Sequence, residues 1–137
     1  MDECMDNCTA ILTHAEIDTV LCGTPREIGH NYSIVDFTAT DAMKADSMGL
    51  VHGGFIFGLA DYAAMIAVNH PHVVLASAEV TFQKPAAVGD KLVARAVIAA
   101  TKGKKRDVTV EITRNGEIVF KGTFICAVLD KHVMTGR

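Results

Sequence analysis

A single carboxylate lies in the most apolar stretch of the sequence. Asp61 is the only charged residue between Gly53 and Val68. A carboxylate on a buried helix loses hydration unless something pairs with it, and that loss raises its pKa toward the range in which it works as a general base. Buried ionisable groups cluster at functional sites. We therefore favour a general base over a buried, hydrogen-bonded structural aspartate.

A pair of glycines, Gly53 and Gly54, opens the same apolar segment. The first amides of a helix have no partner within the helix and lie at the positive end of its dipole. Because glycine has no side chain, a ligand oxygen can approach these amides closely, and they can polarise a carbonyl group and hold the oxyanion formed from it. Close packing or a turn also explains such a pair, and for the glycines alone that explanation is the stronger.

Four other polar residues are weaker candidates. His52, directly before the glycines, either orients a ligand and transfers protons or makes only a hydrogen bond within the loop. Asp46 either points into a cleft or starts a turn. Ser77 and Glu79 share one face of an expected strand, where they either position a water molecule or form an ordinary solvated surface.

The spacing between the glycines and the aspartate predicts an oligomer. Gly53 and Asp61 are eight positions apart, which is about 12 Å along a helix axis. An oxyanion donor and a base must each lie within about 3 Å of the reacting atoms, so one straight helix does not easily supply both. Two antiparallel copies do, which predicts a site shared across a two-fold interface. The strand expected at 73–83 is the plausible edge for pairing two sheets.

The elements that position these residues are one long helix and six strands. The helix at 53–69 is apolar on nearly every face, so other elements must cover it. The strands that follow are joined by short turns, including one at 102–106, which makes neighbours antiparallel. The expected fold is α+β, with a curved antiparallel sheet wrapped around one central helix. Strands are expected at 19–28, 32–40, 73–83, 91–101, 107–114 and 117–130, and a loop at 41–52.

Length and composition favour one domain, residues 1–137, with residues 1–18 as an N-terminal extension that includes a short amphipathic helix at 9–18. Half of the chain is apolar and the net charge is −3, a balance that gives no footprint for binding nucleic acid. The acidic first residues do not form a signal peptide, and Asp61 argues against a membrane helix. The four cysteines form no C-x-x-C pair, so we expect reduced thiols in the cytoplasm rather than a zinc site of Cys4, Cys8 and His14.

Two segments resemble a known family. GLVHGGFIFGLADYAAM at 49–65 resembles the HGG–helix–Asp motif of the hotdog-fold acyl-CoA thioesterases of the phenylacetate-degradation type. FQKPAAVGDKLVARA at 82–96 is similar to the family's aromatic-x-x-Pro…Gly-Asp segment. With the order of the strands, the resemblance covers residues 20–130. It implies the hotdog fold, and a homodimer, often paired into a homotetramer, that binds acyl-CoA at the subunit interface.

The resemblance also implies roles for the residues above. Gly53 would donate the oxyanion amide with Gly54 beside it, and Asp61 of the partner chain would be the general base or the nucleophile. Relatives often carry Asn six residues before the histidine, where this chain has Asp46. Ser77 is the nearest match to the family's Ser or Thr on the strand after the helix. The reaction needs no metal or organic cofactor, since coenzyme A is part of the substrate.

Further residues are expected to contact the substrate. Tyr62, together with Phe55, Phe57 and Met65, would surround the acyl group. A basic hairpin either meets the phosphates of coenzyme A or is a solvated turn, and charge runs alone favour the second. Its residues include Lys102, Lys105 and Arg106.

Three functions compete. The leading hypothesis is a thioesterase that hydrolyses a small-to-medium or aromatic acyl-CoA to the free acid and coenzyme A. The alternative is a non-catalytic module that binds or senses acyl-CoA, which would have no need for Asp61. The third is a hotdog hydratase or dehydratase that uses His52 with a carboxylate.

Overall fold

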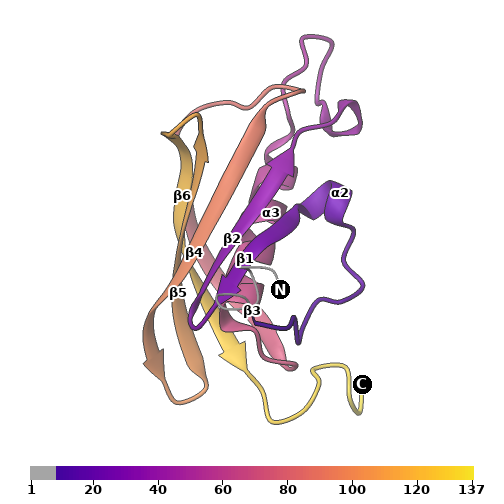
Figure 1. Cartoon of the computed structure of the whole chain (residues 1–137). Coiled ribbons are helices and arrows are strands. Elements are labelled where there is room, and N and C mark those ends of the chain that lie inside the picture. Colours follow the sequence, from indigo (N-terminus) through magenta and orange to yellow (C-terminus); the bar gives the residue numbers. More distant parts are fainter. Residues whose placement is uncertain (1–8) are drawn as a thin grey trace, which may run out of the picture.

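The computed structural model describes residues 9–137, and its largest element is a six-stranded antiparallel sheet curved around one helix, α3 (Figure 1). Helix α3 spans Gly53–Val68. The strands lie in the order β1-β2-β4-β5-β6-β3. This arrangement confirms the predicted fold class. The strands are β1 (Thr24–Gly29), β2 (Tyr32–Thr38), β3 (Val73–Phe82), β4 (Lys91–Lys102), β5 (Lys105–Arg114) and β6 (Glu117–Val128).

Helix α3 is apolar on most sides because the sheet and the N-terminal segment cover it. The buried Ser33 of β2 donates a hydrogen bond of 2.7 Å from its Oγ to the Ala63 carbonyl, which ties the helix to the sheet. On β6, the ring of Phe124 packs 5.4 Å from that of Phe57. Asn69 ends the helix in the left-handed conformation with φ of 51°, a region that asparagine tolerates well. The predicted helix 53–69 is therefore correct to one residue.

The N-terminal prediction is wrong for residues 9–23. No helix forms at 9–18, where the chain is irregular. A one-turn helix, α2 (Thr19–Cys22), forms instead because the Asp18 carboxylate accepts hydrogen bonds from the first amides of that turn, as an N-cap residue does. The expected strand 19–28 therefore begins only at Thr24. The loop at 41–52 contains a short 3₁₀ helix, η1 (Asp41–Met43).

Strand β3 forms one edge of the sheet and pairs only with β6 among the described strands. Phe82 and Ala78 lie on its inner face, yet the Phe82 side chain is 51% exposed and Ala78 is exposed as well. The opposite edge, β1, is shorter and irregular in register between Pro25 and Glu27. A long edge strand without Pro or Lys is open to pairing with another strand, so β3 is the edge suited to an interface.

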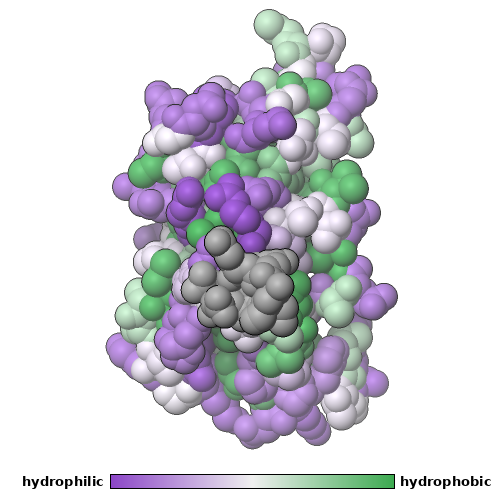
Figure 2. Space-filling view, viewed as in Figure 1, coloured by the Kyte–Doolittle hydropathy of each residue, from purple (hydrophilic) through white to green (hydrophobic). Residues whose placement is uncertain are grey.

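Polar and apolar side chains are interspersed over the face of the molecule in Figure 2. Helix α3, the longest in residues 9–137, has 16 residues, and none of the described helices is long and apolar enough to cross a membrane. The organisation of residues 1–137 as a single domain stays a prediction.

Candidate active site

Asp61 lies in the middle of α3 and is half-buried. Its Oδ1 atom is buried and has no hydrogen-bond partner within residues 9–137. Burial raises the pKa of the carboxyl from 3.8 to about 6. A structural aspartate would be expected to have its buried oxygens paired. The geometry thus favours the general base over the structural alternative that the sequence left open.

Gly58 leaves an open approach beside the aspartate. A Cβ atom at Gly58 would meet no atom within 4 Å. Residues three apart are neighbours on a helix surface, so Gly58 and Asp61 lie on the same side of α3. A ligand that approaches this side meets no side chain at position 58.

The predicted lining of the acyl pocket is found only in part. Tyr62 is buried, with its ring centroid 6.4 Å from that of His14, and Met65 is buried as well. Both therefore belong to the core of this chain. Phe55 and Phe57 are partly exposed and remain available to a ligand.

The start of α3 presents two free amides. His52 is the N-cap residue, but its side chain makes no capping hydrogen bond. The amides of Gly53 and Gly54 donate to no acceptor in the described part of the chain. A cavity of about 330 Å³ adjoins Gly53, and its wall includes Ile56 and Phe82. The arrangement is compatible with an oxyanion hole, since Gly53, whose amide is unpaired, lines a space that can hold a small ligand, whereas Gly54 does not line that cavity.

The two glycines differ in the space that a side chain would find. A Cβ atom on Gly53 would lie 3.4 Å from the ring of Phe82, and one on Gly54 would lie 3.0 Å from the ring of His52. Close packing therefore bears on Gly54, whereas Gly53 has the room of an ordinary van der Waals contact. The His52 ring covers Gly54 and packs edge to face against Phe55, while its backbone amide bonds the Met43 carbonyl.

Asp46 and the strand residues have other surroundings. Asp46 accepts hydrogen bonds from the Met48 and Leu50 amides, so it holds a turn. Glu79 lines a groove on the outer face of the sheet, and Ser77 shares that face with it. Helix α3 covers the inner face, so the structure does not bring Ser77 or Glu79 to Asp61 within one chain. The solvated-surface alternative describes these two residues.

The basic hairpin lies between β4 and β5. Lys102 is exposed, and the Lys105 ammonium lies 3.7 Å from the Asp107 carboxylate. The Arg106 guanidinium donates to the Gly103 and Lys105 carbonyls. Arg106 also lines a pocket, whereas Lys102 and Lys105 do not line that pocket.

Gly53 and Asp61 lie toward opposite ends of β3. Gly53 faces Phe82, the last residue of the strand. Near Asp61 is Cys126, whose thiol pKa is raised to about 12 by burial and then by the Asp61 charge. Cys126 pairs with Leu75 near the start of β3. Within one chain, the oxyanion donors and the base are therefore separated along the helix.

Four histidines lie together at the C-terminal end of α3, a grouping that was not predicted from the sequence. They are His14, His70, His72 and His132, and they line two neighbouring pockets. The one available signal was the His70-Pro71-His72 run directly after the helix. His14 and His132 come from remote segments, so their spacing in sequence gives no motif.

Comparison with known proteins places the chain in a family. Residues 48–121 match the model of the thioesterase superfamily. The chain is 48% identical over 119 residues to methylthioribose-1-phosphate isomerase of Aquifex aeolicus, covering 87% of this chain but 26% of that protein. It is 30% identical over 101 residues to transcription factor FapR of Caldanaerobacter subterraneus, covering 74% of this chain and 50% of that protein. The chain therefore spans a quarter to a half of these curated relatives.

Solved structures extend the comparison. The uncharacterized protein PH1136 from Pyrococcus horikoshii has a TM-score of 0.91 and 52% identity, covering 92% of this chain and 97% of that one. Cj0977, a sigma28-regulated virulence protein from Campylobacter jejuni, has a TM-score of 0.87 and 34% identity, covering 90% and 95%. Smu.793 from Streptococcus mutans, bound to acetyl CoA, is similar in fold, with a TM-score of 0.76, 22% identity, and coverage of 86% and 97%. By its fold and by the family match over residues 48–121, this chain belongs to the thioesterase superfamily.

Proposed function

We propose that this protein hydrolyses the thioester bond of a small-to-medium or aromatic acyl-CoA. The observation that carries the proposal is the half-buried, unpartnered Asp61 carboxylate, with a pKa of about 6. A base is most effective when its pKa lies near the working pH. The cavity of about 330 Å³ at Gly53 is at the small end of ligand sites, which favours an acyl group of modest size. Smu.793, which shares the fold, binds acetyl CoA.

The proposed site is shared by two copies of the chain joined along β3. If two β3 edges pair antiparallel over their full length, Val73 of one subunit lies opposite Phe82 of its partner. Gly53 packs at the Phe82 end of the strand, and Asp61 lies near the Leu75 end. Pairing therefore brings Gly53 of one subunit toward Asp61 of the other. It also covers Ala78 and Phe82, which one chain leaves exposed.

The proposed reaction needs only a water molecule as co-substrate. The Asp61 carboxylate takes a proton from water, and the water oxygen forms a bond to the thioester carbonyl carbon. The carbonyl electron pair moves onto oxygen, where the amides of Gly53 and Gly54 stabilise the charge. When the tetrahedral intermediate collapses, the C–S bond breaks and coenzyme A leaves as a thiolate that recovers the proton. A direct attack by the Asp61 carboxylate is the alternative first step.

A non-catalytic acyl-CoA sensor is the second candidate, because the chain is similar to half of the transcription factor FapR. Such a module would bind the same ligand and would not need a base at position 61. For a hydratase, no contact in the described residues joins the His52 ring to Asp61.

Thiol release from a panel of short, medium, long and aromatic acyl-CoAs tests the proposal. The wild-type protein should release thiol from at least one member, and Asp61→Asn should abolish the release. Asp41→Asn is the matched control, since Asp41 is exposed and ion-paired with Lys44. Saturable binding of acyl-CoA without release would favour the sensor, and hydration of an enoyl-CoA would favour the third hypothesis.

A further inference from the structure

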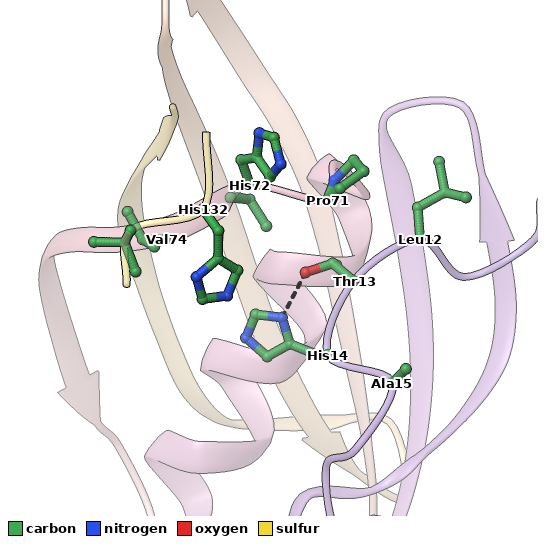
Figure 3. A pocket seen from close by; sticks show the side chains of 10 residues that line it. Leu12, Thr13, His14, Ala15, Pro71, His72, Val74 and His132 are labelled. Carbon is green, nitrogen blue, oxygen red and sulfur yellow. Dashed lines mark hydrogen bonds between the residues drawn. The ribbon is translucent and has the colours of Figure 1, made fainter. Parts of the chain in front are cut away.

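Four of the six histidines in the chain gather at the C-terminal end of α3. His14, His72 and His132 line a pocket of about 430 Å³, and the rings of His14 and His132 project toward it from the two terminal segments (Figure 3). His70 lines a neighbouring pocket of about 360 Å³ with Lys104 and Arg106. His72 lines both pockets, so the two spaces adjoin.

Two of these histidines offer N–H donors without being charged. The His70 Nδ1 atom accepts a hydrogen bond from the His72 amide, and the His132 Nδ1 atom accepts one from the Met134 amide. A neutral imidazole carries one N–H, so the proton of each ring must lie on Nε2. Both rings therefore present an Nε2–H donor, which suits an acceptor-rich ligand.

The charges around the two pockets point the same way. Lys104 and Arg106 line the second pocket, where the Lys104 ammonium lies 2.8 Å from the Asp130 carboxylate. Asp130 is the only carboxylate that lines either pocket in the described residues. The Arg106 guanidinium is held by the Gly103 and Lys105 carbonyls. The pair of pockets is thus a donor-rich, net cationic surface, and the first pocket also has apolar walls, including Leu12, Pro71 and Val74.

We propose that these two adjoining pockets, which we term the histidine subsite, bind the phosphorylated adenosine end of coenzyme A. The inference rests on the proposed function for the identity of the substrate. Phosphates accept several hydrogen bonds and pair strongly with Arg and Lys, while the apolar walls suit the purine. In the proposed dimer, Val73 borders this subsite and faces the partner's Phe82, which packs against the partner's Gly53. The subsite would therefore lie on the same side of the dimer as the partner's Gly53, and the pantetheine arm of coenzyme A would span the distance between the two.

The test compares two thioesters of the same acyl group, one on coenzyme A and one on N-acetylcysteamine, which lacks phosphates and adenine. His132→Ala, His70→Ala and Arg106→Gln should each raise KM for the coenzyme A ester by roughly tenfold, the usual cost of a lost hydrogen bond to a charged group. KM for the N-acetylcysteamine ester should not change. His30→Ala and Arg95→Gln are matched controls from exposed positions away from both pockets.

Equal KM values for wild type and all three variants with the coenzyme A ester would overturn the inference and leave the hydrolase standing. A rise in KM confined to acyl groups with a terminal carboxylate would also overturn it, because the pockets would then read the acyl end. Circular dichroism melting of each variant separates a binding loss from a folding loss.

Calorimetric titration with coenzyme A and with adenosine 3′,5′-bisphosphate makes the test independent of turnover. Binding to wild type that weakens roughly tenfold in His132→Ala and Arg106→Gln supports the histidine subsite even if no thioester is hydrolysed. Absence of binding by either compound to a protein that does hydrolyse acyl-CoA overturns the subsite alone.

Discussion

The ring of Phe82, at the end of β3, packs against Gly53 at the start of α3, so that a Cβ atom on Gly53 would lie 3.4 Å from the ring. That separation is an ordinary van der Waals contact, so the site tolerates an alanine. His52 has φ of −64° and ψ of 132°, which is the extended conformation that a residue before proline prefers. Position 53 therefore accepts two substitutions that differ in one hydrogen-bond donor.

Gly53→Pro should lower kcat by about 10²- to 10³-fold, the usual cost of removing one oxyanion donor. Proline is accepted at the first position of a helix, where its missing N–H has no partner to lose. Gly53→Ala keeps the amide and should retain activity within about threefold of wild type. Steady-state kinetics of the two variants decide the point, and equal losses in both would show that the amide is not the oxyanion donor.

Asp61→Asn should abolish hydrolysis and stabilise the fold. The carboxyl pKa of about 6 lies above the unfolded value of 3.8, so the folded state disfavours the charged form. At about 1.4 kcal/mol per pH unit, removing the charge adds up to roughly 3 kcal/mol to the free energy of unfolding above pH 6. Denaturant unfolding of both proteins measures this gain. A variant less stable than wild type at pH 8 would assign Asp61 a structural role.

The difference between the folded and unfolded pKa values of Asp61 also sets the direction in which stability changes with pH. Between about pH 4 and pH 6 the folded state holds a proton on Asp61 that the unfolded chain has lost, so this contribution to stability falls as the pH rises through that interval. The stability difference between Asp61→Asn and wild type should be near zero at pH 4 and full by pH 8. A constant difference over this range would contradict the raised pKa.

Activity should rise through the same interval, because only the carboxylate accepts a proton from water. We expect kcat/KM to increase tenfold per pH unit well below a midpoint of about 6 and to level off above it. A profile that stays flat from pH 5 to pH 8 would exclude Asp61 as the base.

Gly58 offers a test of access to Asp61. No atom lies within 4 Å of a Cβ placed there, and alanine in a helix interior is about 1 kcal/mol better than glycine. Gly58→Ala should therefore raise the melting temperature. Gly58→Leu should fold but raise KM strongly, because its side chain fills the space beside Asp61. If Gly58→Leu keeps the wild-type KM, the substrate approaches from another side.

Mixing two inactive variants tests the shared site directly. Asp61→Asn and Gly53→Pro chains, unfolded together and refolded in equal amounts, form mixed dimers with one intact site each. Random assembly makes half of the dimers mixed, so about a quarter of the wild-type activity should return. The separately refolded variants are the control. Recovery of no activity, with mixed dimers present, would place both groups in one chain.

The elements with strong periodicity could be predicted from the sequence, but the N-terminal segment could not. Helix α3 was predicted to within one residue because Asn69 ends an uninterrupted apolar run. The helix predicted at 9–18 failed because tertiary contacts decide that segment: the Asn69 side chain binds the Leu12 amide and the Ala10 carbonyl. An amphipathic pattern reflects only local sequence, so it cannot predict hydrogen bonds between residues so far apart in the chain.

The candidate site could be predicted from the sequence where a charged residue lies in an otherwise apolar segment. Asp61 stood out because a charge in an apolar helix has no local explanation. Which face of β3 is outward did not follow from alternation, so Ser77 and Glu79 were proposed near the site although they lie on the outer face. Nothing in the sequence around His14 or His132 marks either residue as unusual, and only the fold brings them to one pocket.

The half-buried, unpartnered carboxylate of Asp61 lowers the stability of the fold while it serves catalysis. A laboratory selection for heat resistance that never rewards catalysis should replace Asp61 early, since a neutral isostere is available at the same volume. If Asp61 is retained under selection for heat resistance alone, it must serve a purpose other than folding stability. The substitution rate at position 61 can be compared between cells that need the reaction product and cells that do not. The difference would show how much the cell depends on the reaction.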